Sequence, residues 1–197
     1  MLATIGKTLV SLPFWKSSSA ENQVCDPVEP LASFDAAAYM GVWYDIQHTP
    51  YVFQPDSAKC TTAHYYDLNA EAGTFTVTNK QQYGILPPSG VTGTGSVAGQ
   101  PNGWVIVSFF GQEFDQPNYK VIDTDYVSYS MVYNCVENDP TNTTYFWILS
   151  RTPTMSADKL NELNAKAATL IPHYDFSQAH LTTQNDTCKY DNSFWTF

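Results

Sequence analysis

The segment YKVIDTDYVSYSMVYNCV, residues 119–136, decides the fold. Its two halves, 119–124 and 129–136, are short runs rich in Tyr, Val, Ile and Met, and such runs are typical of β-strands. The four residues between them, 125–128, are enough for a turn and no more. Because so short a connection leaves neighbouring strands antiparallel, the segment predicts a β-hairpin.

The pattern of this hairpin extends in both directions along the chain. Short runs of alternating apolar and polar residues are separated by turn sequences such as Pro87-Pro-Ser-Gly90 and Gly99-Gln-Pro-Asn-Gly103. Eight strands are predicted, at residues 42–47, 61–68, 74–82, 91–97, 104–110, 119–124, 129–136 and 145–150. All the connections are short, so the strands should form an antiparallel meander.

One helix is predicted after the strands. Ser156 suits its N-cap, Asp158 suits the positive end of the helix dipole, and Pro172 ends the run. Its apolar stripe consists of Leu160, Leu163, Ala167, Leu170 and Ile171. A helix with one apolar stripe must pack against another element, here the outer wall of the sheet. Residues 181–183 then offer one further short strand.

The strand count is compatible with two all-β architectures. Eight antiparallel strands can close into an up-and-down barrel whose interior holds one small ligand. A β-sandwich satisfies the same count, and periodicity alone does not choose between them.

Length, charge and hydropathy exclude several classes of function. The 197 residues fit one domain, and the formal net charge of -10 opposes the approach to nucleic acid or to an anionic membrane surface. No stretch approaches the ~20 consecutive apolar residues of a membrane span. We therefore expect neither a nucleic-acid partner nor a membrane span.

The cysteines and the ends of the chain point to an exported protein. Cys25, Cys60, Cys135 and Cys188 contain no C-x-x-C pair, so structural disulfides are expected, with three connectivities open. Asn142 and Asn185 open N-x-T glycosylation triplets, in agreement with a secreted protein. We divide the chain into a leader or degenerate signal segment at 1–24, a barrel domain at 25–189 and an aromatic tail at 190–197.

Three segments together resemble the lipocalin family, and they favour the barrel. They are Gly41-Val-Trp43-Tyr44 at the start of the first strand, Thr124-Asp125-Tyr126 between the sixth and seventh strands, and Ile148-Leu-Ser-Arg151 at the end of the eighth. Taken singly, G-x-W is a weak motif, but the order and spacing of all three match. The similarity runs over most of residues 25–189 and is greatest to the apolipoprotein D, bilin-binding and crustacyanin branch.

The resemblance implies structural roles for six residues. It pairs Cys25 with Cys135 and Cys60 with Cys188, and each bridge would stabilise the fold by ~2 to 4 kcal/mol. It also implies that Trp43 fills the closed end of the barrel and that the guanidinium of Arg151 lies across its indole. Neither Trp43 nor Arg151 is expected to touch ligand.

The family pattern also fixes which strand residues face inward. Side chains alternate between the two faces of a strand, so counting in twos from Arg151, Gly111 and Thr124 gives the inner set. The expected ligand-binding residues are Tyr145, Trp147, Leu149, Phe109, Val107, Tyr119, Val121, Val77, Asn79 and Phe53. Val105, Ser130 and Val132 would complete the lining, and Tyr51 would join Phe53 as a lid at the mouth.

This set suits a flat or elongated apolar molecule with one or two polar groups. The resemblance implies non-covalent carriage of a bilin such as biliverdin, a carotenoid, a retinoid, a steroid or a fatty acid. Aromatic walls slightly favour a pigment, because they stack on conjugated systems. No cofactor, no metal and no catalytic residue is expected, so the chain is predicted not to be an enzyme.

Two rival functions stay open at this stage. A lipocalin-fold isomerase would need a free cysteine facing the cavity, and a haem binder would need a histidine there, for which His64 is the candidate. The alternative to a carrier is a closed-barrel protein that binds partners through its surface, and the aromatic tail also leaves homo-oligomerisation open.

Overall fold

The hairpin of residues 119–136 forms between β6 (Tyr119–Thr124) and β7 (Tyr129–Cys135) in the computed structural model, which describes residues 25–29, 31, 33–97, 103–135 and 144–190. Asp125 holds the turn, because its Oδ1 accepts hydrogen bonds from the backbone N–H groups of Val127, Ser128 and Tyr129. Burial opposes the charge of this carboxylate, but these hydrogen bonds lower its pKa.

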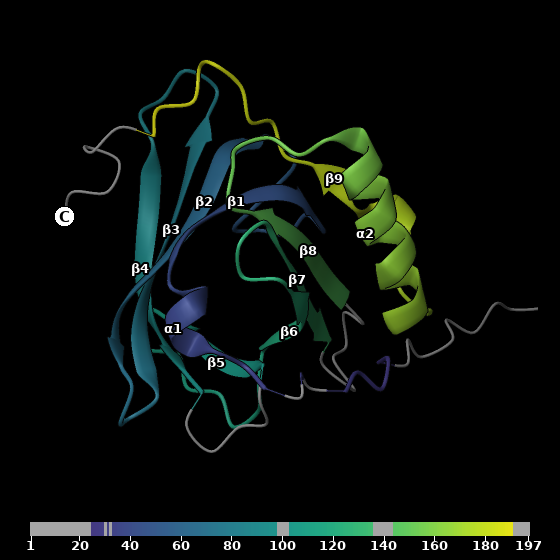
Figure 1. The fold of residues 1–197 in the computed structure, drawn as a ribbon. Helices are drawn as coiled ribbons and strands as arrows, with labels where there is room; N and C mark the ends of the chain where they lie inside the picture. The colour runs from purple at the N-terminus through teal and green to yellow at the C-terminus, as the bar shows by residue number, and fades with distance from the viewer. Residues whose placement is uncertain (1–24, 30, 32, 98–102, 136–143, 191–197) are drawn as a thin grey trace, which may run out of the picture.

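The described strands form one closed antiparallel sheet (Figure 1). The remaining strands are β1 (Gly41–His48), β2 (Ala58–Asn69), β3 (Thr74–Tyr83), β4 (Ser89–Ser96), β5 (Trp104–Phe109), β8 (Thr144–Ser150) and the short β9 (His180–Leu181). Strands β2 to β8 are neighbours in chain order, and β1 pairs with both β8 and β2. The predicted eight-stranded barrel is therefore confirmed.

Strand β1 closes the barrel by changing partners along its length. Gly41–Tyr44 pairs with β2, whereas the end of the strand pairs with β8 and β9 across an irregularity between Asp45 and Gln47. Thr182 extends the β9 contact by donating its N–H to the carbonyl of Ile46. The strand predicted at 181–183 thus begins one residue earlier. It pairs with the part of β1 that no longer pairs with β2.

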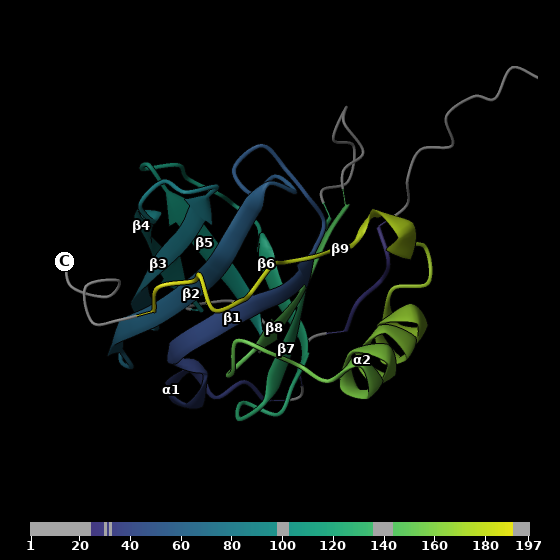
Figure 2. The ribbon, with the colours of Figure 1, turned by 90° about the horizontal axis from the view of Figure 1, so that it is seen from above.

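Helix α2 (Ala157–Leu170) covers the outer wall of the barrel beside β7 and β8 (Figure 2). Ser156 caps it as predicted, with its hydroxyl accepting from the N–H of Lys159. Leu163, Ala167 and Ile171 are fully buried in an outer core. The barrel contributes Ile46, Ile122, Tyr129, Met131, Tyr133, Phe146 and Ile148 to this outer core.

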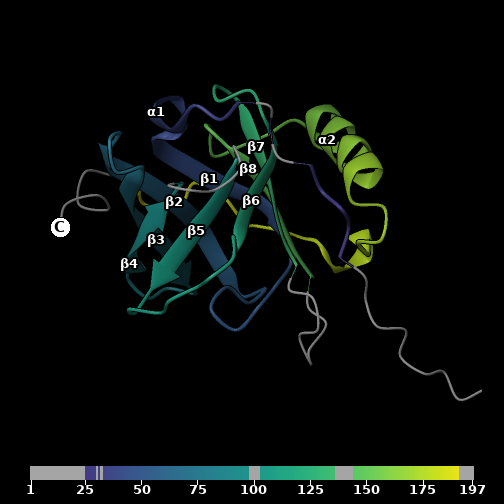
Figure 3. The same cartoon turned by 90° about the horizontal axis from the view of Figure 1, so that it is seen from below.

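Two short helices were not predicted, and one of them, α1, identifies one end of the barrel. Helix α1 (Ala36–Tyr39) lies at the same end as the β6–β7 turn, and the β1–β2 connection lies at the opposite end (Figures 2 and 3). The 3-10 turn η1 (Phe176–Gln178) packs its Phe176 against the outer core.

A second core fills the inside of the barrel, and two glycines of β4 make room for it. A Cβ atom at Gly95 would clash with the ring of Phe75, and one at Gly93 would clash with the ring of Phe109 and the carbonyl of Ser108. The absence of side chains at these positions lets inward-pointing aromatic rings lie directly against the backbone.

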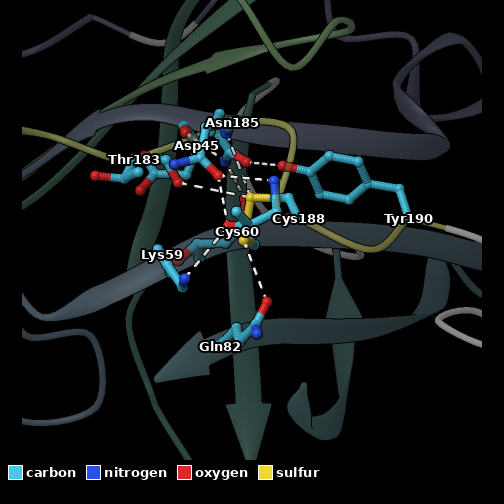
Figure 4. Close-up of a disulfide and its surroundings, with 11 residues drawn as sticks. Asp45, Lys59, Cys60, Gln82, Thr183, Asn185, Cys188 and Tyr190 are labelled. Atoms are coloured by element: carbon cyan, nitrogen blue, oxygen red, sulfur yellow. Dashed lines mark hydrogen bonds between the residues drawn. A yellow bond between two sulfur atoms is a disulfide. The ribbon is translucent and has the colours of Figure 1, made fainter. Parts of the chain in front are cut away.

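Both disulfides join a terminal segment to the barrel. Cys25 is bonded to Cys135 and Cys60 to Cys188, the two pairs that the resemblance implied. Around the second bridge, the N–H of Cys60 donates to the carbonyl of Thr183, and Lys59 donates to Thr187 (Figure 4). These contacts explain why β2 begins at Ala58, three residues before the predicted start.

The other predicted boundaries differ by at most two residues. Strand β4 begins two residues early, at Ser89, and β5 ends one residue early, at Phe109, because Phe110 has a positive φ of 56° and leaves the strand. Residues 1–24 and 191–197, Val136 and Asn142 lie outside the described residues.

Candidate functional site

The end of the barrel beside α1 is closed by Trp43, Tyr39 and Arg151, here called the closed end. Trp43 is 0% exposed, and its indole N–H donates to the carbonyl of Tyr39. The guanidinium of Arg151 lies 3.7 Å from the centre of the Trp43 ring. Its N–H groups donate to the backbone carbonyls of Val42, Tyr126, Ala38 and Tyr39. This contact between Arg151 and Trp43 is the one that the family resemblance implied.

Four hydroxyl groups meet inside the barrel above Trp43, and we call them the hydroxyl cluster. The Tyr39 hydroxyl lies 2.9 Å from both the Tyr119 hydroxyl and the Ser130 hydroxyl. The Tyr65 hydroxyl donates to that of Tyr119 over 2.8 Å. Burial raises the pKa of Tyr39 to about 12 and those of Tyr65 and Tyr119 well above 10. All three phenols are therefore neutral hydrogen-bond donors.

An aliphatic belt surrounds the middle of the interior. Its members come from five of the strands and are buried together: Val77, Val105, Val107, Val121, Val132 and Leu149. All six were predicted to face inward. Phe109, also predicted, is half-buried against them.

Aromatic rings gather at the opposite end of the barrel, here called the open end and defined by Tyr51, Phe53, Phe110, Tyr145 and Trp147. Tyr145 and Trp147 stack with an interplanar angle of 24°, and Tyr51 contacts both edge-on. Phe53 is 64% exposed and Phe110 75%, with their ring centres 6.4 Å apart. The predicted mouth residues therefore lie together, with two of the rings largely in solvent.

Two amides give the open half of the interior its polar groups. Asn79, predicted as a lining residue, is half-buried, and its Oδ1 has no hydrogen-bond donor among the described residues. Gln54 links the β1–β2 connection to the wall, because its Oε1 accepts from the indole N–H of Trp147 and its Nε2 donates to Asp45. An unpaired buried amide oxygen is the kind of group that a ligand or a water molecule satisfies.

A buried acid–base pair near this end was not predicted. Asp45 and His48 on β1 are 3% and 1% exposed, and Asp45 Oδ2 lies 2.7 Å from His48 Nδ1. Thr182, which follows β9, donates its hydroxyl to the same carboxylate oxygen. Burial opposes protonation of His48, but its hydrogen bond with Asp45 and the charge of Asp45 leave the pKa raised. The sequence signal for this pair was the position of Asp45, two residues after the inward-facing Trp43 and therefore on the same face of β1.

The residues considered for rival functions lie elsewhere. His64 alternates with the inward-facing Ala63 and Tyr65, and it stacks on Tyr66 with ring centres 4.8 Å apart, so it faces outward. All four cysteines are in disulfides. Within the described part of the chain, no group of three His, Cys, Asp or Glu side chains could hold a metal ion.

The described residues at the C-terminal end join the barrel wall. Tyr190 packs edge-on against Tyr44, and its hydroxyl donates to Gln184. Figure 4 shows the Tyr190 side chain beside the bridge between Cys60 and Cys188. Asn185 is exposed, and its Oδ1 accepts from the N–H and the hydroxyl of Thr187.

Two hollows also mark the outside of the barrel. One of about 460 Å³ lies between α1 and the β2–β3 turn, and one of about 690 Å³ lies over β4, β5 and residues 110–115. Neither is lined by the hydroxyl cluster or the aliphatic belt. None of the described helices is both long enough and apolar enough to cross a membrane.

Comparison with known proteins identifies relatives of this chain. The family model described as a lipocalin-like domain matches residues 34–184. Rat apolipoprotein D is 28% identical over 165 residues, which cover 78% of this chain and 77% of the relative. The outer membrane lipoprotein Blc of Escherichia coli K12 is 32% identical over 145 residues, covering 71% and 75%.

A solved structure agrees with the fold. Insecticyanin from the tobacco hornworm Manduca sexta superposes with a TM-score of 0.71 at 23% identity, over 85% of this chain and 90% of the other. At this identity the likeness shows the fold alone.

Proposed function

Because this chain belongs to the lipocalin family, whose members bind small hydrophobic ligands, we propose that it carries such a ligand non-covalently inside its barrel. The observation that carries the proposal is the contrast within one interior. The closed end is sealed by hydrogen-bonded side chains, whereas half-buried aromatic rings and an unpaired amide oxygen line the open half. Removal of apolar ligand surface from water would drive binding, at roughly 25 cal/mol per Å².

The proposed contact residues are those predicted from the sequence. Tyr145, Trp147, Phe109 and Asn79 would contact the body of the ligand, and Phe53 would cover it at the mouth. Val77, Val107, Tyr119, Val121 and Leu149 would form the inner end of the pocket. Stacked aromatic rings favour a conjugated ligand, so a bilin such as biliverdin or a carotenoid comes first, followed by retinoids, steroids and fatty acids.

Two further features belong to the proposal. The carrier needs no catalytic residue, and we propose that it is not an enzyme. The two disulfides indicate an oxidising compartment, so we propose that the protein is secreted, with Asn142 and Asn185 as the residues available for glycosylation.

The test is binding of the neutral fluorescent probe N-phenyl-1-naphthylamine to the full chain. We expect saturable binding of one probe molecule, and Trp147→Ala should weaken it at least tenfold. Trp104→Ala is the matched control, since Trp104 alternates with the inward-facing Val105 and contacts Lys120 on the outer face. No probe binding to the wild type would contradict the carrier function and favour a closed barrel that acts through its surface.

The identity of the ligand requires protein from its native source. An absorption spectrum from ~300 to 750 nm and mass spectrometry of an organic extract would identify a bilin or carotenoid directly. A colourless protein that yields a lipid would move the proposal to lipid carriage.

A further inference from the structure

The hydroxyl cluster contains one more hydroxyl hydrogen than it has hydrogen bonds. Tyr39, Tyr65, Tyr119 and Ser130 supply four hydroxyl hydrogens, because each hydroxyl donates one. Three hydrogen bonds join the four groups. One hydroxyl hydrogen therefore has no acceptor among the described residues of the barrel.

Burial decides which hydroxyl keeps the spare hydrogen. Since Tyr65 donates to Tyr119, the spare hydrogen can lie on Ser130, on Tyr39 or on Tyr119. Ser130 is 0% exposed and Tyr39 2%, and neither has a further acceptor among the described residues. An unsatisfied buried donor is costly, so the hydrogens run from Ser130 to Tyr39 to Tyr119.

Tyr119 is also the least buried member of the cluster. Tyr39, Tyr65 and Ser130 are buried, whereas Tyr119 retains part of its surface. Tyr119 faces inward like Val121, two residues along β6. The spare hydrogen therefore lies on the inward-facing side chain that is the least enclosed of the four.

The charges around this point disfavour an anionic partner. Lys80 and Lys120 alternate with the inward-facing Asn79, Tyr119 and Val121, so both point outward. Lys59 reaches Thr187 at the surface, Lys189 is exposed, and Lys159 and Lys166 belong to α2 outside the barrel. Among the described residues, then, no lysine faces the interior.

The charged groups nearest the interior do not change this conclusion. Arg151 lies across Trp43 at the closed end, and its N–H groups are already used by backbone carbonyls. His48 is paired with Asp45, so the two together add no spare positive charge to the wall. A carboxylate held deep in this barrel would lack a cation, and burial of an unpaired charge is strongly unfavourable.

We infer that the barrel selects a ligand with an uncharged oxygen, either a hydroxyl or a carbonyl, which accepts a hydrogen bond from Tyr119 at the base of the pocket. This inference rests on the proposed carrier function and sharpens it. It favours alcohols, ketones and aldehydes over free acids when the apolar body is the same. A ligand with a carboxylate would have to leave that group at the open end.

The test uses pairs of compounds that differ only in the terminal group. Retinol against retinoate, and hexadecan-1-ol against hexadecanoate, compete with N-phenyl-1-naphthylamine for the full chain at pH 7.5. We expect the alcohol of each pair to bind at least tenfold more tightly than the acid. Tyr119→Phe keeps the ring, and it should weaken alcohol binding about three- to tenfold, the range for one neutral hydrogen bond.

The control variant is Tyr174→Phe. This variant also lacks one buried hydroxyl, which in the wild type lies 2.6 Å from the Thr49 hydroxyl. Tyr174 belongs to the outer core and not to the interior of the barrel. We expect its alcohol affinity to match the wild type. Equal affinity for alcohol and acid, or equal losses in the two variants, would overturn the inference while probe binding upholds the carrier function. Failure of the probe itself to bind would overturn both.

Discussion

The two ends of the barrel are built in opposite ways. At the closed end, Trp43 is fully buried, and the backbone carbonyl of Tyr39 accepts hydrogen bonds from its indole N–H and from Arg151. At the open end, Phe53 and Phe110 are mostly exposed, with their ring centres 6.4 Å apart. The same strands run through both ends, so the difference comes from the segments and side chains added at each end: α1 with Tyr39 at the closed end, and the β1–β2 connection with Phe53 at the open end.

This contrast suggests that stability and binding are separable in this molecule. Side chains at the closed end satisfy one another, so their loss should reduce folding stability. Those at the open end keep exposed apolar surface, which a ligand would cover. Substitutions at the two ends should therefore affect different measurements.

Trp43→Ala should have the largest effect on folding. It removes a fully buried indole with its hydrogen bond to Tyr39, and such truncations lower the free energy of unfolding by about 3–5 kcal/mol. Urea unfolding followed by far-UV circular dichroism measures the change. A loss below about 1 kcal/mol would mean that the closed end is not the stabilising one.

Arg151→Ala should have the next largest effect, about 2–3 kcal/mol, because several carbonyls lose their donor along with the contact to Trp43. Probe stoichiometry should stay at the wild-type value. Arg151→Lys keeps the charge without the planar donors, so its free energy of unfolding should lie between those of the wild type and Arg151→Ala. Lost binding at unchanged melting temperature would contradict the purely structural role.

His48→Gln tests the buried pair at the boundary between the two ends. Because the pKa of His48 is raised in the folded state, its charged form stabilises the fold below its ordinary pKa of about 6.5, and this contribution disappears as pH rises through the higher folded value. The stability difference between wild type and variant should therefore be larger at pH 6 than at pH 9.

The matched control for this pH experiment is His180→Gln. His180 is paired with Asp56, but its side chain is 47% exposed, so we expect a small effect on stability. Chemical unfolding of all three proteins at both pH values gives the comparison. A difference for His48→Gln that does not depend on pH would show that its charge contributes nothing.

Phe53→Ala should have the smallest effect on folding, within about 0.5 kcal/mol, since the ring is 64% exposed. It should still weaken probe binding, because the ring covers the mouth of the proposed pocket. Val127→Ala, at a 77% exposed position in the β6–β7 turn, is the control at the closed end. Equal affinities for both variants would remove Phe53 from the binding site.

Local patterns allowed most of the fold to be predicted. Alternation and turn residues located eight strands, and the cap at Ser156 located α2, because these signals act between near neighbours. Helix α1 was missed, since AAAY is too short to show helical periodicity. The disulfide pairing came from the family resemblance, because the spacing of four cysteines leaves three connectivities open.

The candidate site was predictable in its walls and not in its polar contacts. Once the resemblance fixed one inward residue, alternation along a strand gave the aliphatic belt and the ring pair Tyr145 and Trp147. The hydrogen bond between His48 and Thr182 joins residues 134 positions apart, and no local pattern reports such a meeting. The hydroxyl cluster likewise depends on how four elements, α1, β2, β6 and β7, converge.

The closure of the barrel by β1 has a consequence for the biosynthesis of the protein. Strand β1 is among the first strands to be translated, but its partner β8 follows about a hundred residues later. The disulfide partners of Cys25 and Cys60 are translated 110 and 128 residues after them. Because contacts so distant in sequence form slowly, the nascent chain exposes an open sheet edge until translation is nearly complete. Folding factors that shield that edge and deliver disulfides late should therefore govern how much protein is recovered.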